Sequence, residues 1–366
     1  MTSGRLAVLT GKRGPFEFRE FQVPDPEPGA MVLKITAAGI CGSDLHIWRG
    51  DGTLGTDMVP LGHEGTGTIY KLGKGVTSDH RGTPLKEGDR VVYSGPIPCG
   101  RCTICLEGHN SRYCPARQKA VLGQFPYFRS TFADYYYVTP TQAVFKAPDH
   151  VCDETLACVN CAMGTVGMGI EVADIKVGQA IVVMGAGGLG LTAVAMAKAR
   201  GAYPIIVTDR LQNRLDLAKD FGADITINAA ELSTSAERVA AVKKETGGLG
   251  AHVVMELVGI PELVVEAVAM LRPMGTVMEI GSFFPGKPVN IDLSTLVGFG
   301  KRIVGSSMYN PVSLGNTVDF LARNNERMPF DKMVSHRFKL DDIDRAFQAS
   351  EWDQKSSEVR RAVLIP

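Results

Sequence analysis

Short apolar runs, interrupted by glycine and proline, fill the first 150 residues of the chain. Runs of this length between turn-forming residues are typical of β-strands. We predict strands over 31–37, 65–72, 90–93 and 132–138. This part of the chain is therefore expected to be mainly β-structure.

Beyond about residue 161, strand-like runs alternate with longer segments whose apolar residues follow helical spacing. We predict strands at 181–184, 205–208, 225–227, 252–257, 276–280 and 302–305, and helices at 189–200, 211–221, 236–245 and 262–271. Such alternation favours an α/β fold with a doubly wound parallel sheet of the Rossmann type. Helices at 312–323 and 341–350 and a strand at 362–365 complete the prediction.

The overall charge argues against nucleic acid and membranes as partners. The chain has 39 basic and 39 acidic residues, so its formal net charge is zero. Nucleic-acid-binding proteins normally carry a basic excess, and attraction to anionic membranes also needs basic clusters. We therefore expect a small-molecule partner, with no nucleic acid and no membrane.

We find no pattern typical of a signal peptide or a membrane helix in the sequence. The N-terminus lacks the basic-then-apolar order of a signal peptide. The most apolar stretch, 181–197, is broken by glycines and falls short of the roughly 20 residues that a membrane helix needs. These features predict a soluble, cytoplasmic protein.

A glycine-rich turn follows the predicted strand at 181–184 and opens the next predicted helix. Its residues are Gly185, Ala186, Gly187, Gly188, Leu189 and Gly190. In this context the G-x-G-x-x-G pattern predicts a dinucleotide site: the glycines allow a tight turn and close approach of a pyrophosphate, which the helix N-terminus binds. Glycines alone would also fit a loop of no special function.

Asp209 strengthens the nucleotide interpretation. It ends the second strand nineteen residues after Gly190, close to the spacing of about 20 expected for the acid that binds the adenosine ribose. A carboxylate there repels a 2′-phosphate, so we predict NAD as cofactor rather than NADP. Arg210 and Arg214 are further candidates for the coenzyme site, and Arg210 could instead accommodate that phosphate.

Four of the eight cysteines stand close together, at Cys99, Cys102, Cys105 and Cys114. Four thiolates in one short segment suit tetrahedral zinc with no open position, which is a structural site. A nucleic-acid-binding zinc ribbon is the rival interpretation, and the neutral charge counts against it. Taken singly, Cys41 could be an ordinary buried cysteine, and His63 could be a loop histidine.

Several motifs in order give the chain a family resemblance. They are Gly39-Ile-Cys-Gly-Ser-Asp44, Gly62-His-Glu64, Gly88-Asp-Arg-Val91, the four-cysteine segment and the glycine-rich turn. Together they resemble the zinc-containing alcohol dehydrogenases of the medium-chain dehydrogenase/reductase family over nearly the whole chain. The resemblance implies a GroES-like catalytic domain, 1–161 and 309–366, that carries both zinc sites. A Rossmann NAD-binding domain, 162–308, would be inserted into it.

The resemblance also implies a catalytic zinc, and hence two zinc ions per chain. Cys41 and His63 match two of its ligands. The third is selected by the Cys-x-x-Gly-Thr context as Cys161, with Cys158 as the alternative. Glu64 matches a carboxylate that supports the site or serves as an alternate ligand.

Proton transfer and coenzyme contacts follow from the same resemblance. Ser43 matches the hydroxyl that bonds the substrate oxygen, and His46 matches the relay to solvent. Asp44 matches the residue that orients the ligand histidine, and Arg361 a basic residue that reaches the coenzyme pyrophosphate. A turn-capping serine and an exposed histidine remain the simpler alternatives for Ser43 and His46.

We therefore predict zinc- and NAD-dependent oxidation of an alcohol, secondary or cyclic, reversible to the ketone. The substrate class rests on Gly95, which falls where relatives that oxidise primary alcohols carry a bulky side chain. Candidate pocket residues are Trp48, Phe125, Tyr127, Phe284 and Met308. The resemblance further implies a homodimer or homotetramer, through the strand at 302–305.

Two alternatives stay open. One is a zinc-free quinone or enone reductase of the same fold, which would not need Cys41, His63 and Cys161. The other is a zinc protein that binds NAD without catalysis, which would not need Ser43 or His46.

Overall fold

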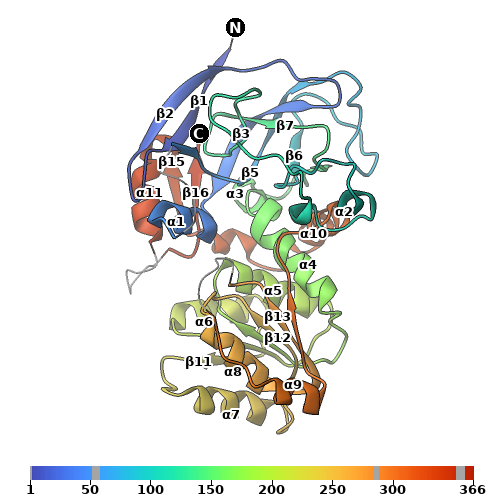
Figure 1. The fold of residues 1–366 in the computed structure, drawn as a ribbon, viewed down its shortest axis with the longest axis vertical. Helices are drawn as coiled ribbons and strands as arrows, with labels where there is room; N and C mark the ends of the chain where they lie inside the picture. The colour runs from blue at the N-terminus through green and yellow to red at the C-terminus, as the bar shows by residue number, and fades with distance from the viewer. Residues whose placement is uncertain (1, 52–57, 283–287, 352–358) are drawn as a thin grey trace. The chain divides into compact units, whose positions relative to one another are not determined.

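The computed structural model describes residues 2–51, 58–282, 288–351 and 359–366. The chain forms two compact units (Figure 1). The first comprises Met1–Gly164, Met308–Asn325 and Phe330–Pro366, and the second Thr165–Ser307 with Glu326–Pro329. These boundaries lie close to the expected ones at 161 and 308, except that the short segment Glu326–Pro329 belongs with the second unit.

The first unit is built on two sheets. Strand β1 (Ser3–Leu9) pairs antiparallel with β2 (Phe16–Gln22) and β4 (Val59–Pro60). The larger sheet has the order β15-β16-β3-β5-β6-β8, and β7 also pairs with β3. Its strands are β3 (Met31–Gly39), β5 (Glu64–Leu72), β6 (Arg90–Tyr93), β7 (Tyr135–Val138), β8 (Val144–Lys146), β15 (His336–Lys339) and β16 (Ala362–Ile365).

Both ends of the chain build this sheet, because C-terminal β16 pairs with β3 through Val363 and Gly39. The helices of this unit are α1 (Gly42–Arg49), α2 (Thr103–Leu106), α3 (Asp153–Leu156), α10 (Pro311–Asn324) and α11 (Ile343–Ser350). Apolar residues of β3, α1 and α11, among them Leu33, Trp48 and Phe347, share one core. That core fixes the end of β3, where the candidate site begins.

The second unit confirms the doubly wound prediction. Six parallel strands take the order β11-β10-β9-β12-β13-β14, in which chain order reverses between β9 and β12 as in Rossmann folds. Their bounds are β9 (Ile181–Met184), β10 (Ile205–Asp209), β11 (Ile225–Asn228), β12 (Ala251–Glu256), β13 (Leu271–Glu279) and β14 (Arg302–Gly305).

Helices cover this sheet as α4 (Gly164–Val172), α5 (Gly188–Ala199), α6 (Gln212–Asp220), α7 (Ser235–Glu245), α8 (Glu262–Met270) and α9 (Leu293–Phe299). Val242 of α7 and Ala267 of α8 pack on Val182, Ile206 and Val254 of the sheet. The strands are apolar on both faces, as expected where helices cover both.

The structure departs from the sequence prediction in two places near the site. The strand predicted at 132–138 begins only at Tyr135, because Ala133 forms a single bridge to Leu6 instead of a ladder. A π-helical turn, Val159–Met163, joins α3 to α4. No periodic signal marks it, since its five residues are buried on every side.

One helix in the described residues, Asp153–Val172, is long and apolar enough by composition to cross a membrane. Its most apolar window has a mean hydropathy of 1.3, and 72% of that window is buried inside the protein. Burial of this extent is what a core helix shows.

Candidate active site

The first part of the site is the junction between β3 and α1. Cys41 precedes α1 as its N-cap, with extended backbone angles. Asp44 in the first turn accepts a hydrogen bond from the Cys41 amide at 2.9 Å, which closes a capping box. Because Asp44 is buried, its carboxylate fixes Cys41 with little freedom.

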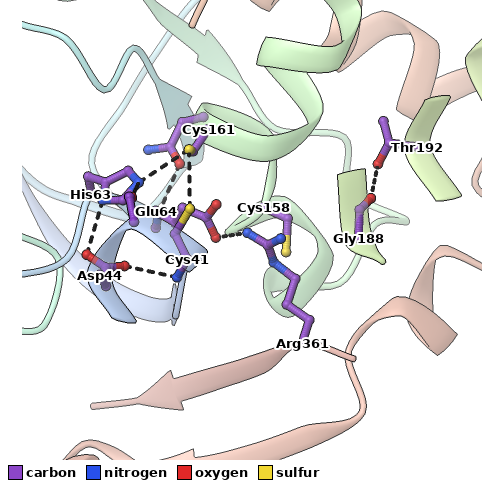
Figure 2. A network of polar contacts seen from close by, with 12 residues as sticks. Cys41, Asp44, His63, Glu64, Cys158, Cys161, Gly188, Thr192 and Arg361 are labelled. Carbon is purple, nitrogen blue, oxygen red and sulfur yellow. Dashed lines mark hydrogen bonds and ion pairs between the residues drawn. The ribbon is translucent and has the colours of Figure 1, made fainter. Parts of the chain in front are cut away.

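His63 approaches Cys41 from the start of β5. Gly62 before it has φ +95°, a left-handed conformation that a side chain would strain. His63 Nδ1 lies 3.3 Å from Asp44 Oδ1, so Asp44 contacts both Cys41 and His63 (Figure 2). An Nδ1–H donated to Asp44 leaves Nε2 free to bind a metal.

Cys161 completes the group from the π-helical turn. Its sulfur lies 3.8 Å from Cys41 Sγ and 3.3 Å from His63 Nε2. The ligand atoms of Cys41, His63, Glu64 and Cys161 all lie within 4.8 Å of one another. Zinc bonds of about 2.3 Å to sulfur and 2.0–2.1 Å to nitrogen, in tetrahedral geometry, separate two thiolates by roughly 3.8 Å and sulfur from nitrogen by roughly 3.5 Å. The donor set and its spacing therefore fit zinc.

The two thiols of this group differ in proton affinity. The pKa of Cys41 lies well below its usual range, because the hydrogen bond from the Cys161 thiol, together with the hydrogen bond and charge of His63, overcomes the opposing effect of burial. The pKa of Cys161 is raised, because donation of that bond and burial both favour its proton. A cation that binds both sulfurs must release this proton.

Glu64 is a buried member of the same group and pairs with Arg361 (Figure 2). Burial raises the pKa of Glu64 to about 7, although Arg361 opposes the shift. Glu64 Oε1 has no hydrogen-bond partner among the described residues, so it fits the predicted role of a supporting or alternate ligand. Arg361 is buried beside Glu64; its contact with a coenzyme stays a prediction.

Cys158, the alternative third ligand, points elsewhere. Its sulfur donates to the Glu154 carbonyl at 3.5 Å, and burial raises its pKa to about 12. It is not a member of the group that could hold a metal. The geometry therefore favours Cys161 as the third ligand.

Ser43 and His46 lie three residues apart on α1, a spacing that places two side chains on the same face of a helix. Ser43 Oγ lies 3.5 Å from His63 Nε2, beside the position that the metal would take. His46 Nδ1 lies 2.9 Å from Asp51 Oδ2, and the imidazole is partly exposed. One residue is thus next to the candidate metal site and the other reaches solvent.

The four-cysteine segment forms a second group with its four sulfurs within 4.8 Å of one another. The sulfur of Cys102 lies 3.4 Å from that of Cys105 and 3.8 Å from that of Cys114. The backbone N–H groups of Arg101 and Cys102 lower the pKa of Cys99 to about 6, which favours the thiolate that zinc requires. The four thiolates would together hold a tetrahedral zinc with no open position, as in a closed structural site.

The glycine-rich turn has the shape that a dinucleotide needs. Gly185 has φ +92°, and a Cβ on Gly190 would collide with the Gly185 carbonyl. By contrast, no described atom lies within 4 Å of a Cβ built on Gly187, and no described side chain caps α5. The amides of Gly188, Leu189 and Gly190 at this open helix N-terminus suit a pyrophosphate.

Asp209 lies beside this turn at the end of β10. Its two carboxylate oxygens accept hydrogen bonds from Ala186 N–H at 2.7 Å and Leu211 N–H at 2.9 Å. The carboxylate is therefore fixed where a ribose would follow the pyrophosphate. Arg210 is exposed and Arg214 is partly buried; their coenzyme contacts stay predictions.

The candidate pocket residues have different surroundings. Met308 lies next to Gly95, where a Cβ would come within 3.3 Å of it. Trp48 lies in the core against Phe347, and Tyr127 stacks on Phe21; a pocket role for either stays a prediction. Phe125 packs edge-on to Tyr127 and Tyr137, and Phe284 lies outside the described residues.

Gly95 was expected to leave room for a bulky substrate, and the structure does not support this expectation. The space that its side chain would fill is taken by the Asn160 carbonyl, at 3.1 Å from a built Cβ, and by Met308. Its lack of a side chain admits these neighbours and does not open a volume for substrate.

Sequence reasoning missed Asn160 and Tyr309, which contact this region. The Tyr309 hydroxyl donates to the Asn160 carbonyl, and Asn160 Oδ1 accepts from Gly65 N–H at 3.1 Å. Neither residue belongs to a spaced motif. The only signal available was a polar residue next to a candidate ligand in an apolar segment.

Comparisons with known proteins agree with this architecture. The alcohol dehydrogenase GroES-like domain matches residues 27–149, and the zinc-binding dehydrogenase domain matches residues 188–323. The 5-exo-hydroxycamphor dehydrogenase of Pseudomonas putida is 32% identical over 354 residues, which are 95% of this chain and 96% of that protein.

Solved structures agree as well. An alcohol dehydrogenase of Thermotoga maritima superimposes with a TM-score of 0.91 at 28% identity, over 100% of both chains. A zinc-binding dehydrogenase of Sinorhizobium meliloti bound to NADP gives a TM-score of 0.85 at 25% identity, again over 100% of both chains. This chain belongs to the zinc-containing alcohol dehydrogenases of the medium-chain dehydrogenase/reductase family. It is an oxidoreductase that acts on CH–OH donors.

Proposed function

We propose that this protein oxidises a secondary or cyclic alcohol to the ketone by hydride transfer to NAD, with a zinc ion held by Cys41, His63 and Cys161. The observation that carries the proposal is the spacing of these three donors, with Ser43 Oγ 3.5 Å from His63 Nε2. Three protein ligands leave a tetrahedral zinc one open position, which is the mark of a catalytic site.

When bound, zinc supplies a Lewis acid that eases loss of the alcohol proton, and the nicotinamide accepts the hydride. The residues of this chain do the remaining work. Asp44 orients His63 and Cys41 through two hydrogen-bonding contacts, which keeps the donor atoms in a fixed geometry. Glu64, paired with Arg361, places a carboxylate behind them.

Ser43 and His46 provide the path for the alcohol proton. Ser43 lies beside the metal position, so its hydroxyl can accept the substrate proton while it donates its own proton toward His46, which lies on the same face of α1. His46, partly exposed and paired with Asp51, can accept a proton at one nitrogen and release one to solvent. A zinc protein without catalysis would need neither side chain.

Asp209 supports NAD as the coenzyme. Its carboxylate is fixed beside the glycine-rich turn, where it would accept hydrogen bonds from ribose hydroxyls and repel a 2′-phosphate. The Sinorhizobium protein bound to NADP shows that a structure of this fold can carry the phosphorylated coenzyme. The choice therefore depends on the side chains of this chain.

The proposed substrate class rests on a relative. The Pseudomonas enzyme is named for hydroxycamphor, a cyclic alcohol. Gly95 does not support this class, because its neighbours fill the adjacent space. We also propose two zinc ions per chain, one in each cysteine-containing group. All eight cysteines are free thiols, which supports a reducing, cytoplasmic location.

A panel of primary, secondary and cyclic alcohols, each assayed with NAD and with NADP, tests the function. We expect the highest kcat/KM for a secondary or cyclic alcohol with NAD. Reduction of quinones or enones by metal-free protein would instead identify a zinc-free reductase. Tight NAD binding without turnover of any alcohol would identify a non-catalytic zinc protein.

A further inference from the structure

The third proposed ligand, Cys161, sits on an unusual piece of backbone. The turn Val159–Met163 is π-helical, and its wider spacing shows in the bond from Met163 N–H to the Cys158 carbonyl at 3.1 Å. π-Helical turns are rare and are frequently found at functional sites. Contacts from outside the turn must therefore keep Cys161 in its place.

Asn160, the residue before Cys161, makes one such contact with its side chain. It is fully buried, and its Oδ1 accepts a hydrogen bond from the Gly65 amide at 3.1 Å. Gly65 follows Glu64 and lies two residues after His63 on β5. One amide side chain thus connects the segment that carries Cys161 to the segment that carries His63.

Tyr309 makes the second contact. Its hydroxyl donates to the Asn160 backbone carbonyl and accepts from Gly95 N–H at 3.1 Å. Its ring lies against Gly164, where a Cβ would come within 2.6 Å of the ring. Burial raises the pKa of Tyr309 well above its usual range, so the hydroxyl keeps the proton that it donates.

We propose that Asn160 and Tyr309 are positioning residues of the metal site, which hold the π-helical turn so that Cys161 Sγ stays at binding distance from Cys41 and His63. The candidate metal group itself consists of Cys41, His63, Glu64 and Cys161. Both act through Cys161, and Asn160 also acts through the strand that begins after His63. The inference rests on the proposed zinc function of that site.

The test measures zinc release from the purified holoenzyme with a chelator that changes colour when it binds zinc. Two sites should give two phases, and a Cys161→Ser variant identifies the phase of the open site by its loss. In Asn160→Ala and Tyr309→Phe we expect that phase to be about 10-fold to 100-fold faster, since loss of a residue that supports a ligand typically weakens metal affinity by that factor. The phase of the four-cysteine site should not change.

Two further variants separate positioning from general stability. Asn160→Asp keeps an oxygen acceptor for Gly65 N–H and should release zinc more slowly than Asn160→Ala. Tyr137→Phe removes another buried hydroxyl of the same unit, one that accepts from Glu27 N–H at 2.9 Å, and should leave both phases unchanged. If Asn160→Ala does not fold, Tyr309→Phe, which removes a single oxygen atom, carries the test.

The outcomes distinguish the two proposals. Two zinc ions in the wild type with unchanged release in folded Asn160→Ala or Tyr309→Phe would overturn the positioning role alone. Equal acceleration of both phases would overturn it too, since it would indicate general loosening. A wild type that holds zinc only in the four-cysteine group would refute the proposed function and this inference together.

Discussion

At the scale of the residue, one carboxylate organises the candidate metal site and another organises the candidate coenzyme site. Asp44 contacts the Cys41 amide and the His63 ring at once, and Asp209 binds the Ala186 amide of the glycine-rich turn and the Leu211 amide before α6. Each carboxylate is thus a local structural element and a functional one. Removal of its charge is expected to affect function more than folding.

Substitution of Asp209 tests the coenzyme assignment. Asp209→Asn removes the charge that would repel a 2′-phosphate and keeps one of the two acceptor oxygens, so either Ala186 N–H or Leu211 N–H loses its acceptor. We expect the ratio of kcat/KM with NADP to kcat/KM with NAD to rise at least about tenfold, since a hydrogen bond to a charged group contributes about 1.5–3 kcal/mol. An unchanged ratio, measured with the same alcohol, would show that Asp209 does not choose the coenzyme.

At the scale of the element, the ends of β12 and β13 in the second unit bring two carboxyl groups together. Glu256 and Glu279 end neighbouring parallel strands and face each other in register. Glu256 accepts hydrogen bonds from Val258 N–H at 2.8 Å and Gly259 N–H at 3.0 Å. Burial, with the charge of Glu279 next, raises the pKa of Glu256 to about 8.

This carboxyl pair predicts a pH-dependent stability. The folded state keeps a proton on Glu256 that the unfolded chain, with a carboxyl pKa near 4.5, has released. The stabilisation is therefore complete below about pH 4.5 and is lost as pH rises toward 8, with a slope of at most about 1.4 kcal/mol per pH unit. Glu279→Gln should flatten this slope, as measured by urea unfolding at pH 5.5 and pH 8.

The comparison of the two slopes is the control, because other titrating groups are common to both proteins. If Glu279→Gln and wild type lose the same unfolding free energy between these pH values, the charge of Glu279 does not contribute to the raised pKa of Glu256.

Sequence patterns predicted regular elements well and irregular ones poorly. The strands at Ile181–Met184 and Arg302–Gly305 were predicted to the residue, because short apolar runs between turns have few alternatives. The π-helical turn and the Asn160–Gly65 contact could not be predicted, since they depend on tertiary packing between segments far apart in sequence. The ligand group was found through ordered motifs, whereas its geometry needed the structure.

At the scale of the whole molecule, β14 is the last described strand of the Rossmann sheet and leaves an edge open to pairing. Leu293, Val297 and Phe299 of the adjacent α9 expose large apolar side chains, which is typical of an interaction surface. We propose that this edge pairs with that of a second copy in a homo-oligomer with closed symmetry.

The oligomer proposal predicts that Val297→Asp weakens association. Val297 is 85% exposed in the single chain, so the new charge should be harmless to folding but costly in an apolar interface. Val177→Asp is the matched control, because Val177 is 83% exposed in the turn before β9. Light scattering after size exclusion should show a lower mass for Val297→Asp only. An unchanged mass would place the interface elsewhere.

The central claim is that Cys41, His63 and Cys161 hold a catalytic zinc, and the zinc content of two matched variants tests it most directly. We expect two zinc ions per chain in the wild type. Cys161→Ser should keep one zinc ion and lose alcohol oxidation, whereas Cys158→Ser should keep two zinc ions and remain active. An inactive, zinc-depleted Cys158→Ser beside an active Cys161→Ser with two zinc ions would contradict the account.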